Sequence, residues 1–155
     1  MEYLTTHDLV WINNIITGAT QPYNYVTLEA AMAGQYSYIQ SQDVPEQAAN
    51  LLGRLLFRTP FQNGNLRTAF IATLTFLNAN GYATTVSDAE AARIFLEAAL
   101  GRTSPRATVD AIAAPADKAL PPTVTLRKLI AYECNLHQEA LKLLASGEVN
   151  TVAAA

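Results

Sequence analysis

The residues best suited to chemistry lie in the segment 59–68, and the chemistry that they favour is anion binding. Asn63-Gly64-Asn65 cannot easily continue a helix, because Asn competes with the backbone for hydrogen bonds and Gly favours turns. Apolar residues recur at helical spacing from Leu66 onward, so Arg67 falls in the first turn of a new helix. A cation is unfavourable there against the helix dipole, so free N–H groups beside an Arg indicate a site for phosphate or carboxylate. A polar turn between helices, with a surface Arg, is the alternative.

This segment resembles the signature of the Fic and Doc (death-on-curing) proteins, which share the Fido fold. The signature runs His-x-Phe-x-Asp/Glu-Gly/Ala-Asn-Gly/Lys-Arg, and in the Doc branch Thr-Ala and an apolar helix ending in Asn-Gly follow it. The residues in register are Phe61, Gly64, Asn65, Arg67, Thr68, Ala69 and the pair Asn80-Gly81. The resemblance implies a domain that transfers AMP, another nucleotide fragment or a phosphoryl group from a nucleotide to a protein hydroxyl.

Three signature positions carry other residues. Thr59 occupies the position of the family His, which acts as the general base. General base catalysis typically raises the reaction rate ~10²- to 10⁴-fold, and Thr cannot fill this role near neutral pH. Asn63 stands at the metal-binding acid, and its neutral amide offers one carbonyl oxygen where Mg²⁺ prefers a carboxylate. Leu66 stands at the Gly or Lys before the Arg, so the phosphate contact of the Lys in the Doc-like branch is lost.

The matching positions belong to the anion-binding half of the family site. We interpret the chain as a degenerate member that has lost the usual transfer chemistry, with no catalytic residue and no metal ligand assigned. The expected ligand is a phosphate or a nucleotide such as ATP, with weakened Mg²⁺ binding. Phe61 is expected to point inward as the anchor of the loop. The nucleotide- or phosphate-binding residues are expected to be Asn63, Gly64, Asn65 and Arg67.

Two other functions fit the same residues. The chain could be an active toxin-like nucleotidyl- or phosphotransferase, in which His7, His137 or the target supplies the base and another group holds magnesium. It could also be a homodimeric interaction module with an empty loop. Either function, like the degenerate one, is compatible with a protein partner, which the resemblance implies to be a target or an antitoxin of a toxin–antitoxin pair.

Composition narrows the class of protein. The 155 residues are 50% hydrophobic and 15% charged, which suits one globular domain. A net charge of -3 with scattered basic residues argues against a nucleic-acid partner. The single cysteine excludes an internal disulfide, and no apolar run reaches the ~18 residues of a membrane span, so a cytoplasmic protein is expected. The low charge suits a partner interface or a neutral, soluble surface.

Periodicity and capping residues predict an all-α bundle of about six or seven helices. A brief extended segment at 82–86 carries no signal for a sheet. The single domain 1–155 divides into a clear family resemblance over 4–101, a helical extension over 103–147 and a frayed tail over 148–155. The expected helices are 6–17, 27–40, 43–58, 66–80, 87–100, 104–114 and about 125–147, the last ended by Gly147.

The remaining chemical residues favour structural roles. His7 is expected at the surface, and Cys134 and His137 are expected to be a buried thiol and a boundary His. The family's self-inhibitory motif is Ser/Thr-x-x-x-Glu followed by Gly or Asn, and its Glu competes with phosphate for the signature Arg. No glutamate here has Ser or Thr four positions earlier, so built-in inhibition of that type is not expected.

Overall fold

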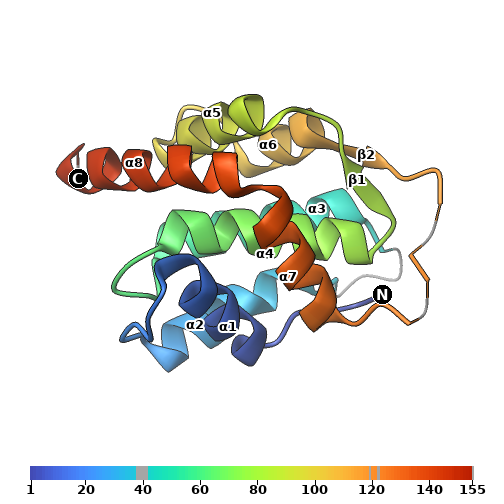
Figure 1. Ribbon diagram of the computed structural model, residues 1–155, viewed down its shortest axis with the longest axis horizontal. Helices are drawn as coiled ribbons and strands as arrows, with labels where there is room; N and C mark the ends of the chain where they lie inside the picture. The colour runs from blue at the N-terminus through green and yellow to red at the C-terminus, as the bar shows by residue number, and fades with distance from the viewer. Residues whose placement is uncertain (38–41, 119, 122, 155) are drawn as a thin grey trace.

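The computed structural model describes residues 1–37, 42–118, 120–121 and 123–154, with side chains through Glu148. This part of the chain contains eight α-helices, one 3₁₀ helix and a two-stranded sheet (Figure 1), which confirms the all-α fold and corrects the expected number of six or seven helices. In chain order the elements are α1 (Thr6–Thr17), α2 (Tyr25–Met32), η1 (Ala33–Gln35), α3 (Val44–Arg58), α4 (Asn65–Ala79), β1 (Tyr82–Thr84), α5 (Asp88–Ala99), α6 (Pro105–Ile112), β2 (Ala113–Pro115), α7 (Leu126–Leu136) and α8 (Gln138–Ala154).

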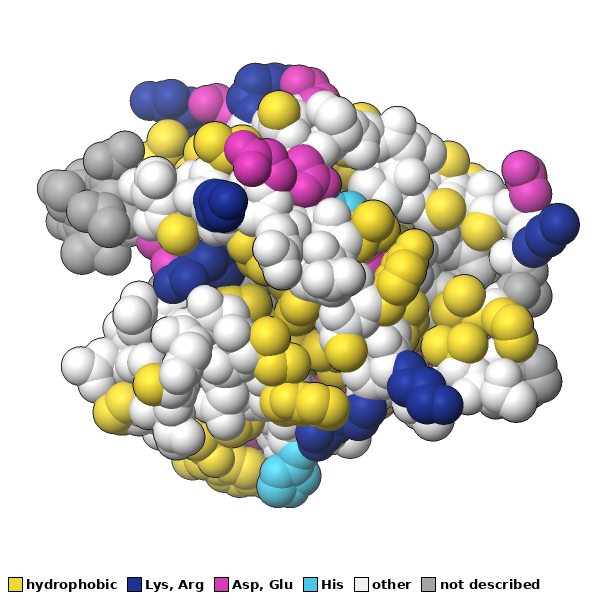
Figure 2. All heavy atoms as spheres, in the orientation of Figure 1, with side chains coloured by type: hydrophobic (Ala, Val, Ile, Leu, Met, Phe, Trp, Pro, Cys, Tyr) yellow, Lys and Arg dark blue, Asp and Glu magenta, His cyan; other side chains and the backbone are white. Residues whose placement is uncertain are grey.

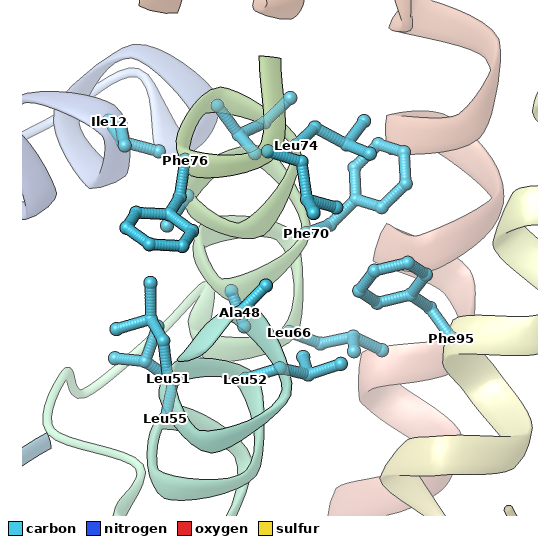
Figure 3. Close-up of a cluster of buried hydrophobic side chains, with 14 of the residues drawn as sticks. Ile12, Ala48, Leu51, Leu52, Leu55, Leu66, Phe70, Leu74, Phe76 and Phe95 are labelled. Carbon is cyan, nitrogen blue, oxygen red and sulfur yellow. The ribbon is translucent and has the colours of Figure 1, made fainter. Parts of the chain in front are cut away.

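Helix α4 is the centre of the fold. In Figure 1 it lies between α1 and α2 on one side and α5, α6 and α8 on the other. Residues 66–77 are all buried except Arg67, so the helix is apolar nearly all round, as a core helix must be. Figure 3 shows Phe70 of α4 pointing toward Phe95 of α5, and their rings meet edge-on with centroids 4.9 Å apart. The rigid core therefore fixes the start of α4, where Arg67 lies.

Short polar side chains begin the helices as the sequence predicts. Thr5 and Asp8 form a capping box at α1, in which each side chain accepts a hydrogen bond from the other residue's backbone N–H. Asp43 and Ser87 accept backbone N–H groups in the first turns of α3 and α5. These oxygens satisfy donors that a helix start leaves unpaired. The expected starts of these three helices are confirmed.

Helix α2 differs from its expected bounds. It begins at Tyr25 because the Asn24 side chain, not Thr27, caps it, and it ends at Met32, where η1 follows. The last part of the expected helix, residues 38–40, lies outside the described residues.

The extended segment after α4 belongs to a sheet, which the sequence analysis did not expect. Strand β1 pairs antiparallel with β2, with Ala83 opposite Ala114. Gly81, in the left-handed conformation, turns the chain out of α4, and β2 comes back from the end of α6 thirty residues later. The pairing is long-range, so three residues of weak β-pattern could not reveal it.

The expected single last helix is wrong. The structure has two helices, α7 and α8, which meet at an angle at His137 (Figure 1). Gly147 does not end α8, which continues to Ala154 through the segment expected to be a frayed tail. Gly147 instead faces α5, where an added Cβ would lie 2.0 Å from Leu96 Cδ2. The glycine permits close helix packing, and this packing sets where the next residue, Glu148, lies.

Candidate anion-binding site

The loop between α3 and α4 opens with an unusual backbone conformation at Thr59. Its φ of 42° is the only positive φ among the described non-glycine residues, and it ends α3 in the left-handed region. A β-branched side chain is disfavoured there, so the backbone at this position is strained. The Thr59 side chain is exposed at the position of the family His.

Phe61 and Asn65 hold the loop in shape. Phe61 is 5% exposed and packs in the core, which confirms the expected anchor. The Asn65 Oδ1 accepts the Phe61 backbone N–H at 2.9 Å, and Asn65 Nδ2 donates to the Phe61 carbonyl at 2.7 Å. Both polar groups of the Asn65 side chain therefore bind the loop itself and help to shape it.

Asn13 of α1 is a second support of the loop. Its Nδ2 donates to the carbonyl oxygen of Asn63 at 2.8 Å and to Thr68 Oγ1 at 3.1 Å. Gly64, with a φ of 77°, passes so close that an added Cβ would lie 3.2 Å from Asn13 Nδ2 and 2.7 Å from Thr17 Cγ2. The sequence analysis missed Asn13, although a polar residue four positions after Leu9, on the apolar stripe of α1, was a usable signal.

Arg67 lies in the first turn of α4, as expected, and the loop directs its donors toward one carboxylate. The Arg67 backbone N–H donates to Glu148 Oε1 at 2.7 Å, and its Nε lies 3.1 Å from Glu148 Oε2. A third donor, Nη1, binds the Ile16 carbonyl at the end of α1 at 2.9 Å. The two side chains are 15% and 12% exposed, so the pair lies near the surface but is not fully solvated.

Glu148 lies at the start of α4, where the sequence analysis expected an anion to bind. No side chain caps this helix, so the Glu148 carboxylate accepts one of the free N–H groups and lies at the positive end of the helix dipole. The sequence lacks the family's self-inhibitory motif, as the sequence analysis noted, but an acid without that motif still reaches Arg67. The motif position four residues before Glu148 is Leu144, which is buried, and close packing of α8 on α5 at Gly147 sets the contact instead.

Asn63, the remaining expected binding residue, faces solvent, as does Thr59 at the position of the family His. The backbone carbonyl of Asn63 accepts the hydrogen bond from Asn13. The loop thus brings together Gly64, Arg67 and the start of α4, and it leaves Thr59 and Asn63 at the rim. Among the residues with described side chains, no group of three or more His, Cys, Asp or Glu residues could hold a metal ion.

A cavity of about 470 Å³ lies beside the Arg67–Glu148 pair, between α1, α7 and α8. Its walls are mostly apolar, with the cations Arg67 and Lys142. Figure 2 shows basic side chains in a hollow of this face, between α8 and the elements below it. Cys134 also lines the cavity, and burial, with a smaller effect from Glu133, raises its pKa to about 11, so the thiol stays protonated near neutral pH.

Neither histidine has a contact with this loop among the described residues. His7 is exposed in the first turn of α1, nine residues before Ile16, which is roughly 14 Å along the helix from the carbonyl that Arg67 contacts. His137 is buried, with its two ring nitrogens beside Asp88 and Glu133. It is not the boundary residue that the sequence analysis expected.

The comparisons with known proteins give one positive result. The model of the Fic/DOC family matches residues 3–77, which contain α1, the whole loop and nearly all of α4. No curated protein and no solved structure matches the chain significantly. None of the helices in the described residues has the length and apolar character needed to cross a membrane.

Proposed function

We propose, from the premise that residues 3–77 of this chain belong to the Fic/DOC family, that the protein is a degenerate member without the usual AMP or phosphoryl transfer. It keeps an anion-binding loop for phosphate or a nucleotide such as ATP, and it acts through contacts with a protein partner. The observation that carries the proposal is the Glu148 carboxylate held by Arg67 at the start of α4.

This carboxylate supports anion binding because it uses the groups that would bind a phosphate oxygen. A backbone N–H at a helix start and an Arg side chain are the common donors to phosphate and carboxylate alike. The loop is already shaped for this purpose by Asn65 and Asn13, so a ligand would not have to order it. A ligand would have to displace the carboxylate of Glu148.

The residues at the rim support the loss of transfer. Thr59 has no group that accepts a proton near neutral pH, and the two histidines are placed elsewhere. Asn63 presents one exposed amide oxygen, a donor set that does not fit Mg²⁺ without several further oxygen ligands. The proposal therefore includes no step that depends on a metal ion.

The first test is calorimetric titration with ATP, with and without Mg²⁺, on wild type, Glu148→Gln and Arg67→Ala. Glu148→Gln should bind ATP with a Kd near the millimolar range or tighter, about -4 kcal/mol or better, and more tightly than wild type. Arg67→Ala should remove the binding, and Mg²⁺ should change it little. Absence of ATP binding by Glu148→Gln would show that the loop is an inherited turn.

A second test restores the missing chemistry. The double variant Thr59→His, Asn63→Asp should gain transfer to protein hydroxyls that wild type lacks. His is also better tolerated than Thr at a positive φ, so the change should not strain the loop further. Thr59→Gly with Asn63→Asp is the matched control, because it relieves the backbone without supplying a base. Transfer by wild type that Arg67→Ala abolishes would overturn the proposal.

The partner contact is proposed at the exposed apolar residues near the loop. Phe57, at the end of α3, is 86% exposed, and Tyr23, Tyr25 and Val26 at the start of α2 are also exposed. Tyr23 lies against the loop, since its ring is 5.8 Å from that of Phe61. Exposed apolar side chains grouped in this way favour a protein interface, with a target, an antitoxin or a second copy of the chain.

A further inference from the structure

The corner between α7 and α8 is made by a buried histidine whose ring bridges two helices. His137 is 5% exposed. Its Nδ1 lies 2.7 Å from Asp88 Oδ1 of α5, and its Nε2 lies 3.0 Å from Glu133 Oε2 of α7, without the alignment of a hydrogen bond. The Phe70 ring of α4 packs edge-on against the imidazole, with the two ring centroids 5.8 Å apart.

The two carboxylates also bind the surrounding helices. Glu133 is 1% exposed and accepts a hydrogen bond from Asn78 Nδ2 of α4. Asp88 Oδ2 accepts the backbone N–H of Ala140 at 3.1 Å. Asp88 therefore caps the first turn of α8 from another helix while it holds the His137 ring, so a single carboxylate ties the start of α8 to α5.

The surroundings of His137 favour its charged form. Burial alone would lower its pKa, but the contacts with Glu133 and Asp88 outweigh burial and raise the pKa above the ordinary value. Among the described residues these two carboxylates are the ionisable groups that contact the ring, and Phe70 and Asn78 supply the α4 side. When His137 loses its proton, the buried Glu133 carboxylate loses its cation and, among the described residues, retains the hydrogen bond from Asn78.

Helix α8 connects this corner to the anion-binding loop. Glu148 lies on α8, eleven residues after His137 at the turn before that helix, roughly 16 Å along the helix axis. Between them, Gly147 packs closely on Leu96 of α5. A helix held at its start by Asp88 and His137 therefore presents Glu148 to Arg67, and a small tilt at the corner would separate the pair.

We propose that His137 is a positioning residue, whose protonated ring latches the start of α8 between Asp88 and Glu133 and so keeps Glu148 on Arg67. Loss of the proton loosens the start of α8 and exposes the Arg67 donors. That a phosphate then binds there rests on the proposed function, but the latch itself does not. Because the folded pKa is raised, the latch is complete below the ordinary His pKa and is lost as the pH rises through the folded value.

The test combines NMR titration with amide hydrogen exchange on the full chain between pH 6 and 9. The chain has two histidines, so two imidazole signals are expected. The His137 signal should titrate above the ordinary His pKa. Protection of amides 138–147 and of Arg67 should then fall about tenfold for each pH unit by which the folded pKa of His137 exceeds its ordinary value. Amides of α3 should keep their protection, which separates latch opening from global unfolding.

Variants complete the test. His137→Gln should lower the protection of α8 at every pH and remove the pH-dependent step, whereas His7→Gln should leave both unchanged. Asp88→Asn should weaken the latch without removing the ring. Unchanged α8 protection between pH 6 and 9 in wild type, or titration of His137 at or below the ordinary His pKa, would overturn the proposal, and neither measurement depends on a variant that folds.

Binding of inorganic pyrophosphate separates the latch from the proposed function. Its affinity for wild type, divided by its affinity for Glu148→Gln at the same pH, should rise as the pH passes through the folded pKa of His137. The ratio cancels the ionisation of pyrophosphate itself. If pyrophosphate binds neither protein but the protection of the α8 amides still falls with pH as expected, the phosphate site is rejected and the latch is retained. If the affinity ratio stays constant with pH and the α8 amides keep their protection, the latch alone is rejected.

Discussion

The two ends of the part of α8 whose side chains the structure describes are attached in different ways. At its start, His137 lies in a buried network with Asp88 and Glu133, and the carboxylate of Glu133 is almost fully enclosed. Eleven residues later, Glu148 meets Arg67 at a site near the surface. Both attachments join groups of opposite charge, but only the second pair lies where an anion from solvent could take the place of the carboxylate.

This difference sets the expected energetics. Removal of one member of a buried charge pair leaves an uncompensated charge and costs about 3–5 kcal/mol. A fully exposed pair is worth about 0.2–1 kcal/mol, because water and salt compete for both groups. The Arg67–Glu148 pair, 15% and 12% exposed, lies between the exposed and the fully buried case. The start of α8 is therefore suited to hold the helix, and the Glu148 contact is suited to exchange. Four changes test this division.

The largest effect is expected for His137→Ala. The change leaves the carboxylates of Asp88 and Glu133 without their shared cation, so the free energy of unfolding at pH 6 should fall by about 3–5 kcal/mol. Urea denaturation followed by circular dichroism measures it. His7→Ala, at an exposed site, should change stability by less than about 0.5 kcal/mol. A small loss for His137→Ala would remove the contrast between the two ends.

The next largest effect is expected at a support of the loop that does not involve α8, the Asn13 side chain of α1. Asn13→Ala removes the donor to the Asn63 carbonyl and to Thr68, and should cost about 1–3 kcal/mol. Asn14→Ala is the matched control, since the structure gives no hydrogen bond of the Asn14 side chain among the described residues. If Asn13→Ala also lowers ATP affinity in the Glu148→Gln background, the loop is preorganised by α1. Unchanged stability would show that α8 alone holds it.

The sequence could predict the local features of the loop, but not the long-range contacts that hold it. The loop lies within ten consecutive residues, so its turn, the Phe61 anchor and the place of Arg67 were predictable from local rules and from the family signature. Asn13 is 50 positions from Asn63, and Glu148 is 81 positions from Arg67. Neither contact has a local signal of its own, because helix packing decides both.

Only part of the buried network of His137, Asp88 and Glu133 could be predicted from the sequence. Glu133 and His137 are four residues apart on a helical pattern, which places them on one face. Asp88, however, comes from the first turn of α5, where its expected role was local to that helix start. The sequence also offered Gly147 as a helix end, since glycine often has that role, and only the position of Leu96 shows why it lies inside α8.

The third prediction uses pH to compare the attachments in the unmodified protein. The folded pKa of His137 is raised, so its contribution to stability is complete below the ordinary His pKa and is lost as the pH rises through the folded value. Between these two values the free energy of unfolding should fall by at most about 1.4 kcal/mol per pH unit from this group. Urea denaturation at several pH values measures the slope. The His137→Gln variant should lack the His137 contribution to this slope. An identical slope in both proteins would contradict a raised pKa for His137.

The smallest effect on stability is expected for Glu148→Gln. The amide oxygen of Gln can still accept the Arg67 backbone N–H, so only the charge is lost, and the free energy of unfolding should fall by about 0.5–1 kcal/mol. The same change should raise the affinity for ATP, because the competing carboxylate is gone. Salt should weaken the wild-type pair and narrow the difference in stability between the two proteins.

Glu139→Gln is the control for Glu148→Gln, because Glu139 lies on α8, is exposed and has no ion pair among the described residues. Denaturation and calorimetry on the three proteins compare both effects directly. A loss of several kcal/mol for Glu148→Gln would mean that this contact holds α8 as firmly as the His137 network, and an anion from solvent could not then replace it. A small loss with a clear gain in affinity would mean that the fold tolerates an open loop, which the His137 network makes possible by holding α8 from its other end.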